Sequence, residues 1–472
     1  MKTKKTILAR LLREYFHLIL ILCGLFFPYS AIAQLPTARE VAVKMKIGWN
    51  LGNTLEAIGG ETAWGAAITT QRLIDSVKAA GFNSVRIPVS WSTHSNTVTH
   101  KIDTAWLFRV KQVVDYCLND SMYVMINVHW DNGWLENHVT VADSSGVNSR
   151  QHAFWTQIAS YFKDYDEHLL FASANEPNVH DATGMSVLLT YHQTFIDAIR
   201  ATGGNNTSRT LVIQGPSTDI DQTYKLMNTL PKDQIANRLI VEVHYYTPWN
   251  FCGLNQDASW GKMFYYWGKG KHSATDVTRN ATWGEESEMD KYLGMMKTKF
   301  IDNGIPVIIG EYGAFRRKLN PPSDQALHDA SIEYYYRYFV KSATNKGIKT
   351  FCWDTPGWMF NRSTGAIIDK RTVNAIMQGI GEAQSTSIAL INQTPTIHLF
   401  PNPFTSTFNL HLDHPEKIAG ISIINMNGKT IEAIKHPEIK SSLILGSALK
   451  PDLYIVKVYG EDQSKSFKLL KK

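Results

Sequence analysis

The 472-residue sequence has few cysteines and few charged residues. It contains only 4 Cys, and Asp, Glu, Lys and Arg together make up 19% of the chain. Removal of a predicted leader leaves Cys117, Cys252 and Cys352, and an odd, sparse set excludes a disulfide framework. We expect buried thiols, with one disulfide bond as an open alternative. No Cys-x-x-Cys pair or metal-ligand histidine spacing occurs, so we expect neither a metal nor another cofactor.

A basic stripe is also absent from the central part of the chain. The net charge of +6 comes from the two ends, since residues 1–33 carry +4 and residues 397–472 carry +3. The region between them is close to neutral. A nucleic-acid-binding protein would need a basic face there, so nucleic acid is not an expected partner.

Long hydrophobic runs are missing beyond the first thirty residues. A basic start, the apolar run 18–28 and the small-x-small triplet Ala31–Ala33 predict a secretory signal peptide over residues 1–33. A membrane anchor would need about 20 apolar residues, so we expect no stable membrane span. Lipidation of Cys23 is disfavoured because Leu22, rather than a small residue, precedes it.

The rest of the chain alternates short apolar runs with amphipathic stretches. The runs are Lys46–Asn53, Ser84–Trp91, Tyr123–Trp130, Leu169–Pro177, Thr210–Ser217, Leu239–Tyr246, Pro306–Gly313 and Thr350–Gly357. The stretches include Thr70–Ala80, Trp106–Asn119, Met185–Thr202, Glu286–Asn303 and Ala326–Lys346. Strict alternation predicts an α/β fold, a closed (β/α)8 TIM barrel over residues 34–382. The alternative, a doubly wound open sheet, would have a Gly-x-Gly-x-x-Gly loop, which the first run lacks.

Polar or indole side chains end seven of these eight runs. In a barrel the carboxyl ends of the strands form one rim, where catalytic residues of this fold lie. The expected rim residues are Asn53, Arg86, His129, Asn175, Glu176, His244, Tyr246, Glu311, Trp353 and Asp354.

Two of these residues, Glu176 and Glu311, are glutamates at the fourth and seventh strand ends. Carboxyls about 5 Å apart hydrolyse glycosides by double displacement, with retention at the anomeric carbon. Arg86 beside Glu311 would keep it ionised, whereas Glu176, partly desolvated near that charge, should stay protonated as the acid. Buried structural ion pairs are the alternative for Arg86 and both glutamates.

The remaining rim residues suit sugar binding. Asn175 is placed to bind the sugar 2-hydroxyl, although a turn before Pro177 is its ordinary role. His129, His244 and Tyr246 would donate to hydroxyls and to the nucleophile, unless the histidines are satisfied core residues. Trp353 is the best candidate for a sugar platform, since indoles stack on pyranose faces. Further tryptophans follow strands, and part of this set is expected in the core: Trp91, Trp130, Trp134, Trp249, Trp260, Trp267, Trp283 and Trp358.

The motifs GWNLGNTLEA, RIPVSW, INVHWDNGWL, ANEPN, HYYTPW, GEYGA and FCWD resemble glycoside hydrolase family 5, most closely its endo-β-1,4-glucanase branch. The similarity spans residues 41–382. It implies that Glu176 is the acid/base and Glu311 the nucleophile, with Arg86, His129, Asn175, His244, Tyr246 and Trp353 around them. Many relatives have two histidines where this chain has His129-Trp130. This departure bears on glycone recognition rather than on hydrolysis.

The segment 247–283 is an aromatic-rich insert that we expect to form an ordered wall of the substrate cleft. The sequence leaves open whether cellulose, mixed-linkage glucan, xyloglucan or mannan is preferred.

Residues 383–396 have little charge and no periodicity, which favours a linker. Short alternating runs over 397–472 then predict a small β-sandwich. This tail resembles the C-terminal sorting domain of the type IX secretion system, through HLFPNPFTSTFNL, IINMNGKTI and the terminal DLYIVKVYGEDQSKSFKLLKK. Asp452 stands where relatives usually have glycine. A carbohydrate-binding module is disfavoured because the tail has no tryptophan.

Together these patterns predict a secreted, retaining endo-β-1,4-glucanase. Its expected partners are a β-glucan substrate and the type IX secretion machinery, and we expect a monomer. A xyloglucanase or an endo-β-mannanase on the same scaffold remains an alternative. A non-catalytic surface glycan-binding protein is disfavoured because it would need neither Glu176 nor Glu311.

Overall fold

The computed structural model describes residues 35–321, 323–392, 397–412, 415, 418–435, 440–459 and 464–472. The predicted signal peptide, residues 1–33, lies outside this part. Contacts divide the chain into two compact units, one ending at Ile380 and the other beginning at Gly381.

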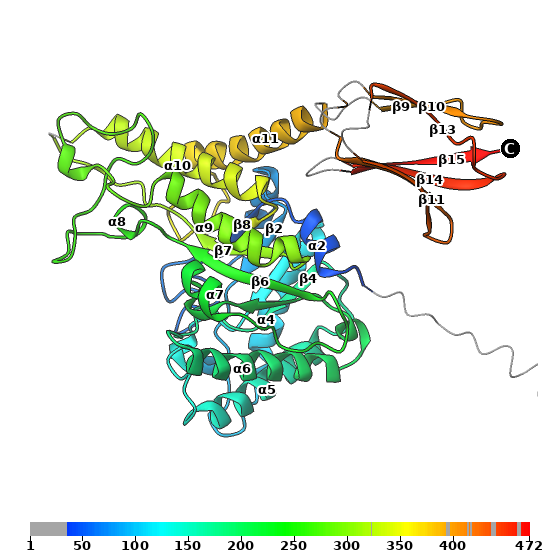
Figure 1. The fold of residues 1–472 in the computed structure, drawn as a ribbon. Coiled ribbons are helices and arrows are strands. Elements are labelled where there is room, and N and C mark those ends of the chain that lie inside the picture. Colours follow the sequence, from blue (N-terminus) through cyan, green and yellow to red (C-terminus); the bar gives the residue numbers. More distant parts are fainter. Residues whose placement is uncertain are drawn as a thin grey trace, which may run out of the picture. The chain divides into compact units, whose positions relative to one another are not determined.

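The first unit is a closed barrel of parallel strands in chain order, β1 to β8, as predicted (Figure 1). The strands are β1 (Gly48–Asn50), β2 (Ser84–Ile87), β3 (Tyr123–Asn127), β4 (Leu169–Ala172), β5 (Leu211–Gln214), β6 (Leu239–Tyr245), β7 (Val307–Tyr312) and β8 (Lys349–Cys352). Most are shorter than the predicted runs at their carboxyl ends. The chain there turns into rim loops, so polar rim residues follow the strands or occupy their last positions.

A helix follows every strand of the barrel, and one further helix precedes the first strand. The helices are α2 (Ala38–Lys44), α3 (Gln71–Ala79), α4 (Thr104–Asn119), α5 (Ser144–Tyr161), α6 (Ala182–Ala201), α7 (Ile220–Leu226), α8 (Trp249–Cys252), α9 (Glu286–Lys299), α10 (Gln325–Asn345) and α11 (Lys370–Asn392). Aspartates cap several amino ends, because their carboxylates accept orphan backbone N–H groups. Asp103, Asp181 and Asp324 accept from Ala105, Gly184 and Leu327.

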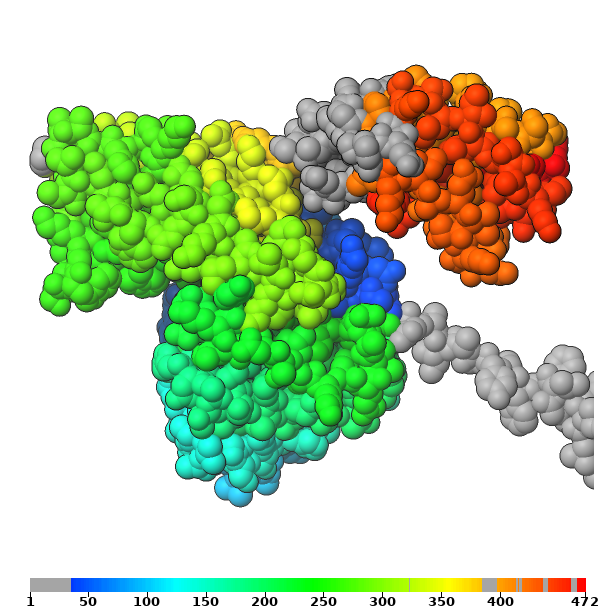
Figure 2. Space-filling model, in the orientation of Figure 1, coloured from blue at the N-terminus to red at the C-terminus, as the bar shows by residue number. Residues whose placement is uncertain are grey.

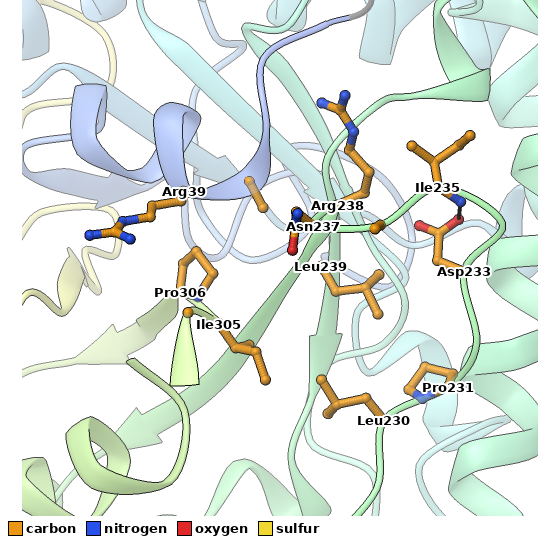
Figure 3. A pocket seen from close by; sticks show the side chains of 13 residues that line it. Arg39, Leu230, Pro231, Asp233, Ile235, Asn237, Arg238, Leu239, Ile305 and Pro306 are labelled. Atoms are coloured by element: carbon orange, nitrogen blue, oxygen red, sulfur yellow. Dashed lines mark hydrogen bonds between the residues drawn. The ribbon is translucent and has the colours of Figure 1, made fainter. Parts of the chain in front are cut away.

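Helix α2 closes the amino-terminal end of the barrel. Its Ala38 and Val41 belong to one buried cluster with inward-facing strand residues such as Met125, Leu170 and Ile308. Beside it a cavity of about 200 Å³ lies among α2, the loop before β6 and the start of β7 (Figure 3). With this end filled, the open end of the barrel is the carboxyl-terminal rim.

The insert after β6 packs against the start of α10. The backbone N–H of Trp267 donates to Ser331, and the hydroxyl of Tyr266 accepts from the N–H of Asp324. In Figure 2 these segments form one continuous surface, coloured green to yellow-green. The insert is therefore ordered against the barrel.

Beyond the end of α11, the second unit consists of β-strands in two sheets, as predicted. One sheet has the order β13-β10-β9 and the other β12-β11-β14-β15. The strands are β9 (Ile397–Phe400), β10 (Phe408–Leu412), β11 (Gly420–Asn425), β12 (Thr430–Lys435), β13 (Ser442–Leu445), β14 (Asp452–Tyr459) and β15 (Ser464–Lys471). Phe408 and Leu410 of one sheet share a buried cluster with Ile421 and Val456 of the other, so the two sheets enclose a common core.

Helix α11 reaches Asn392 and therefore runs into the segment predicted as a linker. Val373 and Ile376 at its start are buried in the barrel core. Among the described residues, no helix is both long enough and apolar enough to span a membrane.

Candidate active site

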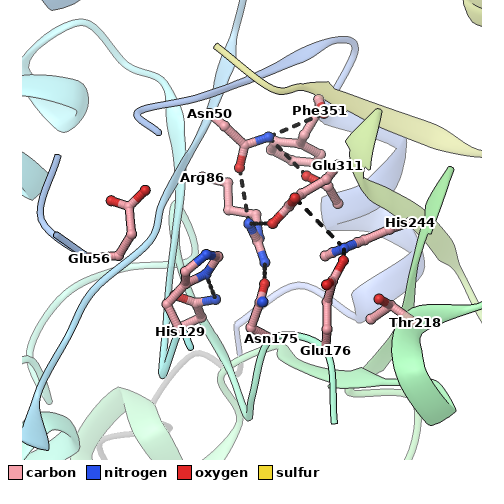
Figure 4. A network of polar contacts seen from close by, with 12 residues as sticks. Asn50, Glu56, Arg86, His129, Asn175, Glu176, Thr218, His244, Glu311 and Phe351 are labelled. Carbon is pink, nitrogen blue, oxygen red and sulfur yellow. Dashed lines mark hydrogen bonds and ion pairs between the residues drawn. The ribbon is translucent and has the colours of Figure 1, made fainter. Parts of the chain in front are cut away.

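The rim residues expected from the sequence meet at the carboxyl-terminal end of the barrel (Figure 4). Arg86 lies on β2, His244 on β6 and Glu311 on β7, whereas Glu176 lies in the loop just after β4. Residues from three strands and from the loop after a fourth thus form one polar network.

Glu311 is held from two sides. Its Oε1 accepts a hydrogen bond from Nη1 of Arg86 at 2.8 Å, and its Oε2 accepts one from the Tyr246 hydroxyl at 3.1 Å. Arg86 is fully buried. Burial opposes its charge, but Glu242 and Glu311 outweigh it and raise the pKa of Arg86. The permanent cation therefore fixes the orientation of the Glu311 carboxyl group.

Glu176 is paired with His244, whose Nδ1 lies 2.7 Å from Oε1 of Glu176. Burial works against ionisation of Glu176, but the hydrogen bond and charge of His244 prevail and lower its pKa. This differs from the sequence-based prediction of a protonated Glu176. The sequence analysis expected His129, His244 and Tyr246 to donate to sugar hydroxyls and to the nucleophile, and it did not foresee the shorter contact of His244 with Glu176.

Three carboxylates surround His244. Its Nδ1 is 3.8 Å from Oε2 of Glu311, and its Nε2 is 3.3 Å from Oε1 of Glu242. Burial disfavours the charged ring, yet Glu311, Glu176 and Glu242 together raise the pKa of His244 to about 10. The ring is therefore an imidazolium at neutral pH, and it donates from both nitrogens.

The two candidate catalytic carboxylates lie close together. One oxygen of Glu176, one of Glu311 and a nitrogen of His244 are all within 4.8 Å of one another. This spacing suits a retaining glycosidase rather than an inverting one. The same three side chains form one of two groups in the described chain whose spacing would also allow a metal ion. Asp166, Glu167 and His168 form the other such group in the described chain, and Asp166 there is exposed.

Glu242 is a member of this network that sequence reasoning missed. It is fully buried, forms an ion pair with Nε of Arg86 at 2.9 Å and accepts from Gln214. A Cβ at Gly310 would overlap its carboxylate, so glycine there makes room for it. The available signal was alternation, because Glu242 stands two residues before His244 on β6 and faces the same side.

Asn50, rather than the predicted Asn53, joins the network from β1. Its side chain accepts from Nη1 of Arg86 at 3.1 Å and donates to the carbonyl oxygen of Gly310 at 2.9 Å. Asn53 has φ of 53°, and its backbone N–H donates to the carboxylate of Glu56. Burial raises the pKa of Glu56 to about 7.

His129 and Trp353 face each other across the rim. Their rings are stacked, with centroids 5.8 Å apart and planes 9° apart. Nδ2 of Asn127 lies 3.1 Å from Nδ1 of His129, so Nδ1 accepts and Nε2 carries the proton. Burial and the nearby charges of Arg86 and His244 hold the pKa of His129 far below its usual value. A neutral N–H donor thus borders the indole.

The tryptophans divide as expected between core and surface. Trp91, Trp134 and Trp267 are buried, whereas Trp358 is half-buried. The other four of these eight are exposed and lie in the segments after β3 and β6, namely Trp130, Trp249, Trp260 and Trp283, and Trp64 in the loop after β1 is exposed as well.

Asp354 is structural. It is fully buried, where it accepts from Nε1 of Trp49 and from the N–H of Met359 and forms an ion pair with Arg362. It therefore shapes the loop after β8.

Known proteins share both parts of the chain. Residues 50–357 match the family described as cellulase (glycosyl hydrolase family 5), and residues 398–472 match the secretion system C-terminal sorting domain. A xyloglucan-specific endo-β-1,4-glucanase of Bacteroides ovatus is 36% identical over 368 residues, which cover 73% of this chain and 70% of the relative. Endoglucanase A of Paenibacillus barcinonensis is 33% identical, covering 73% of this chain and 90% of the relative.

Solved structures give the same comparison. A xyloglucan-specific β-1,4-glucanase from a ruminal metagenomic library superposes with a TM-score of 0.69 at 44% identity, covering 73% of this chain and 96% of the other. A broad-specificity endoglucanase from Bacteroides salanitronis has a TM-score of 0.64 at 35% identity, covering 73% and 95%.

Proposed function

Because the chain belongs to glycosyl hydrolase family 5, we propose that Glu311 is its nucleophile and Glu176 its general acid/base. The observation that carries this assignment is the approach of the two carboxylates, whose oxygens lie within 4.8 Å across the rim. Each has the partner that its role needs, a permanent cation for Glu311 and a proton-bearing ring for Glu176.

The enzyme is a secreted, retaining endo-β-1,4-glucanase. Its relatives are endoglucanases and xyloglucanases, and the family hydrolyses glycosides with retention. The C-terminal sorting domain directs export by type IX secretion to the cell surface or beyond it.

In the first step Glu311 attacks the anomeric carbon and the glycosidic bond breaks. The leaving oxygen takes a proton from Glu176, and Glu311 becomes a glycosyl ester. Arg86 and the Tyr246 hydroxyl orient the attacking carboxylate, because they bind different oxygens of it.

The acid proton is shared by Glu176 and His244. The resting pair is a carboxylate and an imidazolium, and one transfer along their 2.7 Å hydrogen bond gives a neutral acid and a neutral ring. Formation of the ester removes the charge of Glu311, which is the largest electrostatic cause of the raised His244 pKa. Glu176 can then accept a proton from water, which attacks the ester and releases the sugar.

Asn175, His129 and Trp353 bind the sugar at the reacting centre. The oxygen of the Asn175 amide accepts from Nη2 of Arg86 at 2.9 Å, which leaves its NH2 group for the 2-hydroxyl. Nε2 of His129 donates to another hydroxyl, and the indole of Trp353 stacks on the ring. Trp130, 40% exposed, extends this surface, and Asn53 borders it after β1.

Xyloglucan is the favoured substrate among the β-1,4-glucans. The support is the 44% identity to a xyloglucan-specific glucanase, higher than the 35% to the broad-specificity enzyme. The exposed indoles Trp249, Trp260 and Trp283 of the insert after β6 offer apolar contacts for a branched chain. No comparable observation favours mannan.

The enzyme acts as a monomer with its mature catalytic domain over residues 34–382, a connecting segment over 383–396 and the sorting domain over 397–472. Support for this boundary comes from the division into compact units after Ile380.

Hydrolysis of xyloglucan, cellulose oligosaccharides and mannan oligosaccharides, followed by NMR of the new reducing end, tests this proposal. We expect β-configured products and the highest kcat/KM on xyloglucan. Initial release of the α-anomer would refute double displacement. Cleavage of mannan alone would refute the substrate, and binding without cleavage would make the chain a glycan-binding protein.

A further inference from the structure

Glu136, in the loop after β3, holds the backbone of the proposed acid/base. Its Oε1 accepts a hydrogen bond from the N–H of Glu176 at 2.8 Å, and its carbonyl oxygen accepts from the N–H of Asn178 at 3.0 Å. Glu136 is only 7% exposed. One residue therefore fixes the loop after β4 at two points on either side of Pro177.

The N–H that Glu136 binds belongs to the peptide group that joins Asn175 to Glu176. The side-chain oxygen of Asn175 accepts from Nη2 of Arg86 at 2.9 Å, so this residue is held through its side chain and through the following peptide group. Two adjacent residues, one proposed to bind the sugar hydroxyl and one the leaving oxygen, therefore share the backbone segment that Glu136 fixes.

The loop that carries Glu136 is itself firmly anchored. Asp131 at its start is fully buried and accepts from the N–H of Trp91 at 2.9 Å and from Nε1 of Trp134 at 3.0 Å. Leu135 is 1% exposed. A carboxylate on so constrained a loop can define the position of its partners.

We infer that Glu136 is a positioning residue of the reaction, which sets the place of the Glu176 carboxyl and of the Asn175 amide relative to the glycosidic bond. This inference rests on the proposed function of Glu176. Burial and the nearby charges of Glu176 and Glu311 raise the pKa of Glu136 to about 7, consistent with its place among them. Its effect is exerted through these two residues.

Leaving groups of different acidity test this role in the full-length protein. A sugar leaving group needs a proton from Glu176, whereas 2,4-dinitrophenolate does not. We compare kcat/KM, which reports the first step alone, because Glu176 also acts as the base of the second step. We expect Glu136→Ala to lower kcat/KM at least about 30-fold on xyloglucan but less than about threefold on 2,4-dinitrophenyl β-cellotrioside. Equal losses on both substrates, or no loss, would overturn the inference.

Glu61→Ala is the matched control. Glu61 is also 7% exposed, lies in the loop after β1 and accepts from the backbone N–H of Thr69 at 2.7 Å, but it contacts neither catalytic carboxyl. A purely structural loss of this kind should lower both rates by the same factor. A change in the ratio of the two rates for Glu61→Ala equal to that for Glu136→Ala would also overturn the inference.

Glu136→Gln keeps the test decisive if the alanine variant does not fold. The amide oxygen can still accept from the Glu176 N–H, so we expect a loss of less than about tenfold on xyloglucan that remains selective for the sugar leaving group. An unselective loss would contradict the inference. Glu176→Ala separates the acid role of Glu176 from the positioning role of Glu136. An equal loss on both substrates in Glu176→Ala would refute the acid role itself. A loss confined to xyloglucan in Glu176→Ala, but not in the Glu136 variants, would refute the positioning role alone.

Discussion

Nδ1 of His244 lies 2.7 Å from Oε1 of Glu176, a residue 68 positions away in the chain. The contact couples the protonation states of Glu176 and His244. In the resting enzyme the proton that Glu176 donates to the leaving group is bound to His244. The pH dependence of the enzyme should therefore belong to the pair.

Glu311→Gln should abolish hydrolysis and leave polysaccharide binding largely intact. The amide keeps the shape of the side chain but cannot attack the anomeric carbon, so we expect kcat to fall at least about 10⁴-fold. Initial rates and affinity electrophoresis on xyloglucan measure the two properties. Glu167→Gln is the control, because Glu167 precedes β4 and so lies at the end of the barrel opposite the catalytic rim. Activity near the wild-type level in Glu311→Gln would exclude Glu311 as the nucleophile.

His244→Asn should narrow the pH profile from its alkaline side. In the wild type the pair keeps its proton until the pH approaches the raised His244 pKa of about 10. A carboxyl alone has a pKa of about 4.3, so the alkaline limb of kcat should move down by at least about one unit. His168→Asn, at the surface, should keep the wild-type profile. If the alkaline limb of the kcat profile were at the same pH in His244→Asn and wild type, Glu176 and His244 would not share the acid proton.

The same substitution should affect stability in a defined pH window. The folded-state pKa of His244 is raised, so its contribution is complete below the unfolded value of about 6.5 and disappears as the pH rises towards 10. The difference in unfolding free energy between wild type and His244→Asn should shrink over this range. Urea unfolding followed by tryptophan fluorescence reports on the barrel alone, because all 13 tryptophans precede residue 359.

Glu242→Gln should destabilise the barrel by about 3 kcal/mol at pH 7, because it removes one of the two carboxylates that pair with buried Arg86 and leaves Glu311 as the other. Burial raises the pKa of Glu242, but Arg86 and His244 lower it overall. Its contribution is therefore present above its unfolded value and is lost as the pH falls through the folded one. The difference in unfolding free energy between wild type and Glu242→Gln should become smaller as the pH falls below about 4. A constant difference down to pH 3 would refute the ion pair.

Trp353→Ala should weaken the reaction with oligosaccharides by removing the indole face beside His129. We expect kcat/KM to fall at least about tenfold and Trp353→Phe to recover part of the loss. Phe108→Ala, at an exposed position of α4, is the aromatic control. Equal kcat/KM values for Trp353→Ala and wild type would remove Trp353 from the substrate surface.

Much of this architecture could be predicted from the sequence, because alternation of strand and helix repeats in every unit of a barrel. The rim residues were predictable for the same reason, since each interrupts an apolar run near its end. Glu242 and Asn50 escaped notice because they lie inside such runs. Barrel closure brings Glu242 on β6 to Arg86 on β2, whereas Asn50 lies beside Arg86 in the pairing of β1 with β2. The partner of His244 could not be predicted either, since Glu176 lies in the loop after β4, 68 residues away in the chain, and the sequence does not show where that loop places its side chain.

The overlap that a side chain at Gly310 would have with the carboxylate of Glu242 couples two positions in the evolution of these barrels. Gly310, which directly precedes Glu311, cannot carry a side chain because the carboxylate of Glu242 on the neighbouring strand β6 fills that space. A homologue with alanine at this position should carry a smaller residue in place of Glu242 and balance its arginine in another way. Covariation of these two positions would therefore identify the homologues that share this charge network.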